Sequence, residues 1–183
     1  MNSVTRYSSL AIALHGLMAL LIFVVFPLGV YMHELPLSPD KLKLYSYHKW
    51  IGITLLLLVA IRLIWRLAHT PPPLPDSVVA WQRRASAAVH GLLYLLMIAI
   101  PLSGWLMSSA KGFPVVWFGV LPLPDLVEKN RELGELLAEV HQVLNFTLLA
   151  LVVMHVGAAL QHHFIERQPF LQRMGWGRKM EGS

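Results

Sequence analysis

The chain has 183 residues, of which 56% are hydrophobic and only 14% are charged, and its mean hydropathy is +0.57. A soluble domain carries about 25% charged residues, so this composition predicts an integral membrane protein. The chain has no cysteine, which excludes disulfides, iron–sulfur clusters, thiolate zinc sites, cysteine nucleophiles and thioether-linked haem. The nine histidines, set against only ten carboxylates, require an explanation.

Four apolar segments are long enough to cross a bilayer, which takes roughly 20 predominantly apolar residues in a helix. We expect transmembrane helices at residues 8–32, 45–67, 85–110 and 140–165. The first segment is much longer than the apolar region of a signal peptide and contains a histidine, so we do not expect it to be cleaved. The chain is therefore predicted to be a single all-α transmembrane domain over residues 1–183, a four-helix bundle.

Basic residues are divided unevenly between the two sides of these helices. Nine are expected on the side that holds both termini and the Pro-rich loop after the second helix, and six on the other side. By the positive-inside rule both termini are cytoplasmic, in the inner membrane of a bacterium, and the other two loops are periplasmic. The longer of these, 113–139, is expected to include a surface helix from Leu126. The pI near 9.7 thus reflects orientation, and no nucleic-acid binding is expected.

Histidines recur inside the predicted helices. Seven lie within them or at their ends: His15, His48, His90, His141, His155, His162 and His163. A single histidine in a span often only hydrogen-bonds to a neighbouring helix. A histidine there is unfavourable unless it is paired or bound, so the whole set indicates a functional site.

The spacing of the histidines indicates two levels. His141 and His155 are 14 residues apart, which puts them on nearly the same helix face and about 21 Å apart. His48 matches the depth of His141, and His15 matches that of His155. Two facing imidazoles at each level are typical of two bis-histidine b-type haems stacked across a membrane. A histidine proton relay is the alternative.

A third histidine leaves the cytoplasmic level ambiguous. His90 lies at much the same depth as His15 and His155, and spacing alone does not decide which two of the three are ligands. Zinc is not expected at either level, because it would need a third or fourth ligand that the helix interiors do not supply.

Three glycines are candidates for making room beside a porphyrin. Gly29 and Gly104 each follow a helix histidine by 14 residues, and Gly52 lies one turn after His48. Close helix packing is the alternative explanation for each of them. Arg62 also follows His48 by 14 residues. It is a candidate partner for a haem propionate, since a buried cation needs an anion. Arg66 is explained equally well as a side chain at a helix end that extends its charge to the membrane–water interface.

Several short motifs together resemble the prokaryotic dihaem cytochrome b561 family, over about residues 6–170. They are His48-Lys-Trp-Ile-Gly52, Arg62-Leu-Ile-Trp-Arg66, Pro71-Pro-Pro-Leu-Pro75, His90-Gly-Leu-Leu-Tyr94, Pro101-Leu-Ser-Gly-Trp105, and the fourth-helix histidines His141, His155 and His162-His163.

The resemblance implies a ligand set and a reaction. His48 with His141 would hold the periplasmic haem b, and His15 with His155 the cytoplasmic one, which leaves His90 without a haem. His162 matches a position that the family connects with ubiquinone. A compact single-chain member resembles a superoxide oxidase, an oxidoreductase that takes electrons from periplasmic superoxide and passes them to ubiquinone.

Cations near the periplasmic haem should attract an anionic substrate. Lys49 adjoins His48 and is the candidate substrate contact, with Lys41 and Lys43 just before it. We expect neutral replacements of these lysines to slow superoxide oxidation. The alternative function is a cytochrome b anchor that relays electrons from a periplasmic hydrogenase or dehydrogenase to quinone, the only reading that requires a protein partner. A haemless helix bundle or a proton-coupled transporter is the third candidate function.

Overall fold

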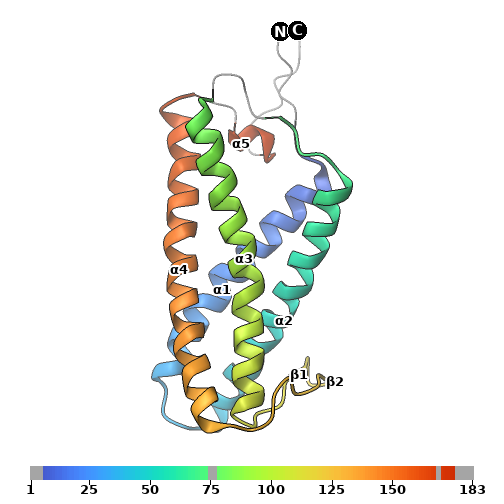
Figure 1. Ribbon diagram of the computed structural model, residues 1–183, viewed down its shortest axis with the longest axis vertical. Helices are drawn as coiled ribbons and strands as arrows, with labels where there is room; N and C mark the ends of the chain where they lie inside the picture. The colour runs from blue at the N-terminus through green and yellow to red at the C-terminus, as the bar shows by residue number, and fades with distance from the viewer. Residues whose placement is uncertain (1–5, 74–77, 168–169, 176–183) are drawn as a thin grey trace.

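The computed structural model describes residues 6–73, 78–167 and 170–175. Its four long helices are α1 (Ser9–Glu34), α2 (Pro39–Ala68), α3 (Ala80–Ala110) and α4 (Arg131–Phe164). The hairpin strands β1 (Val116–Trp117) and β2 (Leu121–Pro122) follow α3, and the one-turn helix α5 (Phe170–Arg173) follows α4 (Figure 1). The four expected spans fall on the four long helices, and the helix ends agree with the expected ends to within two residues. The last three of these helices begin five to nine residues earlier than expected. The predicted all-α four-helix fold is confirmed.

Polar side chains begin three of the long helices. Ser8, Ser38 and Asn130 each accept a hydrogen bond from the backbone N–H three residues later, which satisfies one of the free donors of the first turn. Because Asn130 caps α4, this helix begins well before its apolar part and runs into it without a break. The separate surface helix expected from Leu126 is therefore not formed.

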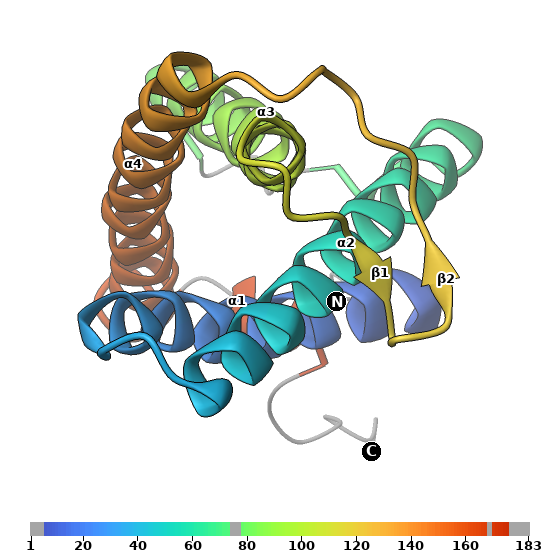
Figure 2. The ribbon, with the colours of Figure 1, turned by 90° about the horizontal axis from the view of Figure 1, so that it is seen from below.

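The helices form a ring in the order α1, α2, α3, α4 (Figure 2). Backbones pack closely between α1 and α2, between α2 and α3, and most extensively between α3 and α4. Across the remaining seam, α1 and α4 meet through side chains: Phe26 and Phe146 form an edge-to-face pair with ring centres 5.8 Å apart. Both histidine pairs described below also join α4 to the α1–α2 half of the ring.

The buried core lies midway along the bundle, in two clusters. One is formed by Met18, Leu55 and Val59, and the other by Leu93, Leu96, Ile100 and Leu148. Ile22 and Met97 contact both clusters and so join them. Since lipid tails are as apolar as these side chains, close van der Waals packing holds the helices together.

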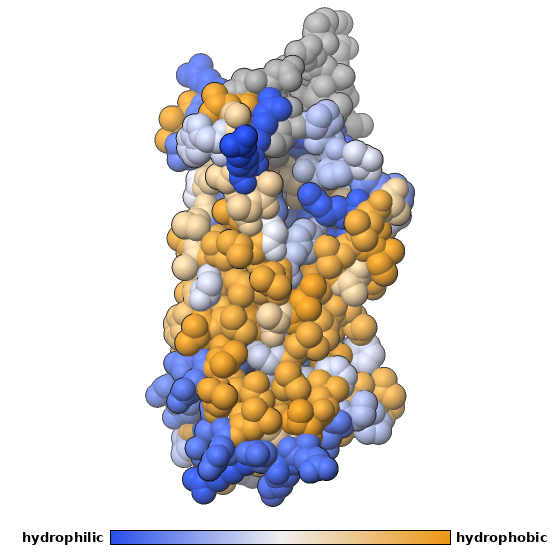
Figure 3. All heavy atoms as spheres, viewed as in Figure 1, coloured by the Kyte–Doolittle hydropathy of each residue, from blue (hydrophilic) through white to orange (hydrophobic). Residues whose placement is uncertain are grey.

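The face of the bundle seen in Figure 3 is apolar over its middle and polar at its two ends. All four long helices are long and apolar enough to cross a membrane, and little of their most apolar stretches is buried inside the protein. This is a multi-pass membrane protein. We call the end with β1, β2 and the α1–α2 connection the hairpin end, and the end with α5 the α5 end (Figure 1).

Candidate functional site

Two pairs of histidine rings face each other inside the ring of helices. His48 on α2 and His141 on α4 have ring centres 6.2 Å apart, and we call them the hairpin-end pair. His15 on α1 and His155 on α4 have ring centres 6.3 Å apart, and we call them the α5-end pair. The structure thus brings together the residues that the sequence matched by depth, with almost the same spacing at both levels.

Leu148 separates the two pairs on α4. It lies seven residues from His141 and seven from His155, on the same face, so about 10 Å of helix lies on either side of it. Its side chain is buried against Leu93, Leu96 and Ile100 of α3. A cluster of apolar side chains therefore lies between the two histidine levels.

Each ring of the hairpin-end pair lies directly against a glycine of a neighbouring helix. A Cβ placed on Gly29 of α1 would come within 3.0 Å of Cε1 of His48, and a Cβ on Gly104 of α3 would come equally close to Cε1 of His141. Such a contact is tighter than nine in ten real Cβ contacts, so the imidazole would have to move by a few tenths of an ångström. At these two positions the space that a side chain would need is therefore occupied by an imidazole ring. Clearance for a porphyrin beside these glycines stays a prediction from the sequence.

The two histidines of the hairpin-end pair differ in their hydrogen bonds. His141 Nδ1 lies 2.9 Å from Ser103 Oγ and 3.1 Å from the backbone carbonyl of Ile100. Ser103 is only 6% exposed and donates its own hydrogen to the Ile100 carbonyl, so its oxygen acts as acceptor for an Nδ1–H of His141. This arrangement places the hydrogen of a neutral ring on Nδ1 and leaves Nε2 as the atom able to bind a metal.

His48 has no such hydroxyl. Its Nδ1 is buried and makes no hydrogen bond within the part of the chain that the structure describes. The backbone carbonyl of Val25, four residues before Gly29, lies nearby but outside hydrogen-bonding geometry. Among the described residues the His48 ring is therefore held by its packing against Gly29, whereas the His141 ring is held by packing and by hydrogen bonds.

The α5-end pair has a third ring beside it. His90 of α3 lies with its ring centre 5.2 Å from that of His155, edge to face, and its Nδ1 is 3.3 Å from Ser86 Oγ. The sequence left open which two of His15, His90 and His155 are ligands, and in the structure both other rings lie close to His155. The spacing favours His15, because 6.3 Å repeats the 6.2 Å of the hairpin-end pair.

Arg62 lies among these three histidines at the α5 end. Its Nε donates to the Tyr94 hydroxyl at 2.9 Å, and Nη1 donates to the carbonyl of Ala11 at 2.8 Å. It is close enough to act electrostatically on His15 and His155. None of the ion pairs between described residues involves Arg62, so a partly buried cation faces the site without an anion. The guanidinium of Arg66 instead lies over the Tyr94 ring, with Cζ 5.9 Å from the ring centre.

Gly52 faces open space. No atom beyond its own helix backbone and chain neighbours lies within 4 Å of a Cβ built there. Its position one turn after His48 is thus compatible with clearance beside a bound group.

His162 lies near the α5 end of α4, two turns beyond His155. Its Nδ1 is 2.8 Å from Oε2 of Glu166, and both side chains are largely but not fully buried, with 21% and 32% exposed. The neighbouring His163 ring packs edge-on against Phe164, with ring centres 4.8 Å apart. The carboxylate orients the imidazole of His162 at the polar boundary of the bundle.

The lysines singled out in the sequence are engaged with the protein itself. Lys49 Nζ donates to the carbonyls of Phe113 and Pro114, at 3.2 and 3.5 Å. Lys41 Nζ donates to two carbonyls at the C-terminal end of α1, and Lys43 pairs with a carboxylate one turn away at 3.7 Å. These ammonium groups hold loops and helix ends together, and sequence reasoning had no means of seeing those contacts.

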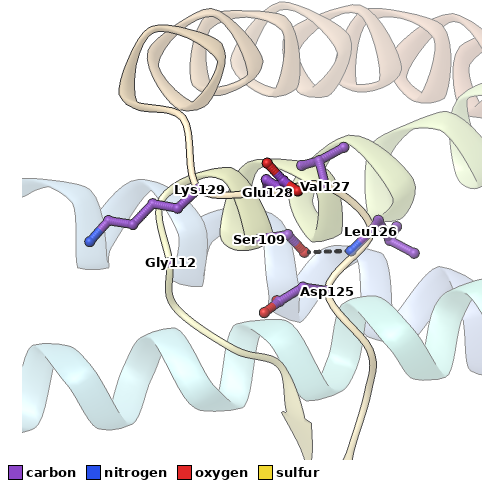
Figure 4. A pocket seen from close by; sticks show the side chains of 7 residues that line it. All are labelled: Ser109, Gly112, Asp125, Leu126, Val127, Glu128 and Lys129. Atoms are coloured by element: carbon purple, nitrogen blue, oxygen red, sulfur yellow. Dashed lines mark hydrogen bonds between the residues drawn. The ribbon is translucent and has the colours of Figure 1, made fainter.

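Two cavities open at the hairpin end. The larger, about 450 Å³, lies between Ser109 and the segment Asp125–Lys129, where Asp125 and Glu128 contribute carboxylates (Figure 4). The smaller, about 310 Å³, is lined by Ala110, Lys111, Phe113, Lys129, Arg131 and Glu135. Its one carboxylate, Glu135, is paired with Arg131 at 2.9 Å. We call the second the basic pocket.

The basic pocket lies between His141 and the hairpin end of the bundle, where α3 and α4 pack together. A Cβ on Gly134 would touch the Lys111 side chain at 2.8 Å, just as one on Gly104 would touch His141. Lys111 follows Gly104 by seven residues in the chain, and Gly134 precedes His141 by seven, so the Gly134–Lys111 contact lies two helical turns from the Gly104–His141 contact. The pocket is therefore about 10 Å from His141 toward the hairpin end.

The geometry of both histidine pairs fits a metal held in a macrocycle. An imidazole nitrogen ligates a metal at about 2.0–2.1 Å, so two rings that share one ion from opposite sides have centres roughly 6 Å apart. No group of three or more histidine, aspartate or glutamate side chains placed to hold a metal ion occurs among the described residues. Two ligands from the protein leave the other coordination positions of an iron to a porphyrin.

Comparisons with known proteins cover nearly the whole chain. A family model described as prokaryotic cytochrome b561 matches residues 6–177. Cytochrome b561 homolog 2 of Escherichia coli (strain K12) is 37% identical over 175 residues, which cover 94% of this chain and 93% of that protein. Cytochrome b561 homolog 1 of the same strain is 29% identical over 172 residues, covering 92% and 96%. A probable superoxide oxidase CybB of Yersinia pestis is 26% identical over 179 residues, covering 92% and 95%.

Proposed function

The chain belongs to the prokaryotic cytochrome b561 family of electron-transfer membrane proteins, and we propose that it holds two noncovalent b-type haems, one on each histidine pair. His48 and His141 are the axial ligands at the hairpin end, and His15 and His155 those at the α5 end. The observation that carries this proposal is the repeat of one imidazole spacing, 6.2 and 6.3 Å, at two depths of the same bundle.

The residues around the pairs support the same cofactor. Haem iron supplies reversible one-electron transfer, with a potential set by axial ligands, hydrogen bonds and burial. Gly29 and Gly104 let two of the rings approach neighbouring helices, and Ser103 sets the tautomer of His141. The unpaired guanidinium of Arg62 suits the propionate of the α5-end haem. The buried apolar cluster around Leu148 separates the two levels.

We further propose that superoxide donates electrons at the hairpin end, on the periplasmic side, and that ubiquinone accepts them at the α5 end, on the cytoplasmic side of the inner membrane. Two superoxide anions each lose one electron and leave as O₂, while one ubiquinone takes up two electrons and two protons to become ubiquinol. The similarity to a probable superoxide oxidase supports this reaction.

Charges at the two ends are consistent with these substrates. The basic pocket offers Lys111, Lys129 and Arg131 about 10 Å beyond His141, where an anion approaching the hairpin-end haem would pass. His162, oriented by Glu166, can hydrogen-bond a quinone carbonyl and exchange a proton with it.

The haem content is tested on the purified protein. A reduced-minus-oxidised visible spectrum should show low-spin b-type haem, and a pyridine haemochrome assay should give two haems per chain. Alanine variants of His15, His48, His141 and His155 should each lose one haem. Colourless protein, or one haem in the unmodified chain, would contradict the proposal.

Superoxide as substrate is tested by stopped-flow oxidation at low and high salt. Replacing Lys111, Lys129 and Arg131 by glutamine should slow the reaction at least several-fold at low salt and flatten its salt dependence, because steering raises association rates about 10-fold or more. Arg84→Gln is the control, because that arginine is exposed near the start of α3, at the opposite end of the bundle from the basic pocket. Equal rates in all variants at low salt would rule out steering by the basic pocket.

The alternative function, an anchor subunit for a periplasmic hydrogenase or dehydrogenase, predicts a large metal-bearing protein that copurifies in mild detergent. Superoxide oxidation by the isolated chain would favour the self-contained oxidase over the anchor. The haemless reading is not favoured, because membership of this family implies b-type haem.

A further inference from the structure

The β1–β2 hairpin covers the outer side of α2. Trp50 Nε1 donates to the carbonyl of Val116 at 2.6 Å, and Trp117 Nε1 donates to Thr54 Oγ1 at 3.3 Å. At about 100° per residue, Trp50 and Thr54 point roughly 200° and 240° away from His48 around the helix. Because His48 faces the interior, the hairpin lies on the side of α2 that faces away from the bundle (Figure 2).

The hairpin reaches down to membrane depth. Trp50 is the first residue of the apolar run of α2 that follows Lys49, and Thr54 lies one turn further into that run, beyond the level of His48. The connecting chain carries no charged side chain between Lys111 and Asp125. Its tip is apolar and points outward: the exposed fractions are 56% for Phe118, 83% for Val120 and 51% for Leu121. A periplasmic loop meant to stand in water would not be expected to carry this surface.

The backbone of the hairpin is arranged for a place with little water. Three of its residues are prolines, Pro114, Pro122 and Pro124, which have no N–H to satisfy. The carbonyls of residues 113–117 and of Pro124 accept hydrogen bonds from the backbone or from lysine, serine and tryptophan side chains. The carbonyls of the tip, residues 118–120, accept none from the described residues. Irregular backbone in the hydrocarbon must have its polar groups satisfied by the protein, so the base of the hairpin suits that depth and the tip suits the boundary with the headgroups, where water is present.

Aromatic rings line the contact between hairpin and helix. Trp50 lies 5.2 Å from Tyr47 and 5.5 Å from Phe118 between ring centres, and Phe118 lies 5.1 Å from Trp117. Tryptophan and tyrosine favour the boundary between headgroups and hydrocarbon. Phe118 has a φ of 51°, unusual for a bulky residue, and the following Gly119 has a φ of 72°. The turn thus holds an aromatic ring at the tip in a strained conformation.

We propose that the hairpin is a membrane anchor: its tip, Phe118–Leu121, inserts between the lipids of the leaflet at the hairpin end, at the boundary of headgroups and acyl chains. The occupant of this surface is lipid because the tip continues the lipid-facing side of α2 and carries no charge to recognise a protein or a particular headgroup. The anchor braces α2 at the level of His48, so that it holds the depth of this ligand.

Single cysteines test the depth of the tip, since the natural chain has none. Val120→Cys and Leu121→Cys are spin-labelled in the full haem-loaded chain, in vesicles of phosphatidylethanolamine and phosphatidylglycerol. Collision rates with oxygen, which concentrates in the membrane, are compared with those of a water-soluble nickel chelate. Leu57→Cys, on the lipid-exposed middle of α2, is the membrane control, and Glu128→Cys, on the exposed loop before α4, is the water control.

The proposal expects the ratio of oxygen to nickel collisions at both tip positions to exceed that at position 128 by several-fold and to lie below or at that of position 57. A ratio equal to that of position 128 would show that the tip stands in water and would overturn the proposal. Protection from both reagents would show that protein covers the tip, a second copy or a partner, and would overturn it as well. An unchanged haem spectrum confirms that each labelled variant is folded.

Discussion

The hairpin-end and α5-end histidine pairs have the same ring spacing and entirely different surroundings. At the hairpin end each ring is pressed against a helix glycine, and His141 is held by Ser103 and a carbonyl. At the α5 end a third histidine and an unpaired Arg62 crowd the pair, and no glycine contact holds a ring. The two sites are alike in the spacing of their histidine rings. Tight packing surrounds the hairpin-end pair, whereas polar and charged side chains surround the α5-end pair. Such differences set haem potentials apart.

The largest effect is expected from filling the glycine contacts of the hairpin-end pair. Gly29→Val or Gly104→Val puts a branched side chain where the imidazole lies, with Cβ only 3.0 Å from Cε1. We expect these variants to fall from two haems per chain to about one, measured by pyridine haemochrome, and to keep the α5-end haem. Gly157→Val is the matched control, because a Cβ there meets nothing within 4 Å. Loss of both haems, or of neither, would break the distinction between the two sites.

A large effect on potential is expected from Arg62. A cation beside a haem favours the reduced state, which carries one positive charge fewer, so Arg62→Met should lower the midpoint potential of the α5-end haem. Loss of a charge-assisted contact of about 1.4 kcal/mol corresponds to about 60 mV for a one-electron couple. Redox titration followed by visible absorbance measures it, with the hairpin-end potential as internal reference. A shift confined to the hairpin-end haem would place Arg62 in the wrong site.

A smaller shift is expected from Ser103. In Ser103→Ala the Nδ1–H of His141 loses one of its two acceptors, so the ring donates less charge to the iron and the hairpin-end potential rises. The partial or complete loss of one hydrogen bond changes the free energy by about 0.5–1 kcal/mol, which corresponds to a shift of about 20–40 mV in the midpoint potential of a one-electron couple. Ser103→Thr keeps the hydroxyl and should restore the original potential. A threonine variant that behaves like alanine would mean that packing, and not the hydrogen bond, is responsible.

The smallest effect is expected from His90. His90→Ala should keep two haems per chain and their low-spin spectra, because we propose His15 and His155 as the α5-end ligands. The His15→Ala variant serves as the comparison and should lose one haem. The reverse result, with His90→Ala losing a haem and His15→Ala keeping both, would assign His90, whose ring is the nearer one to His155, as the ligand.

The four helices and the two histidine levels were predictable from sequence because both depend on distance along a regular helix. Fourteen residues is close to four turns wherever it occurs, so His141 and His155 must share a face, and the apolar runs must span the bilayer. The hairpin was not predictable in the same way. Its strands are two residues each. They are held by Trp50 of α2, which donates to Val116, and by Trp117 of the hairpin, which donates to Thr54 of α2, contacts between residues more than sixty positions apart in sequence.

The sequence by itself thus determined a cysteine-free, histidine-rich membrane bundle whose imidazoles meet at two depths, because composition and helical period act locally. Only the tertiary structure decided what surrounds each ring. Gly29 and Gly104 contact imidazoles, Ser103 acts on His141, and Lys49 holds a loop, because each contact joins different helices whose rotation and separation are set by packing of the whole bundle.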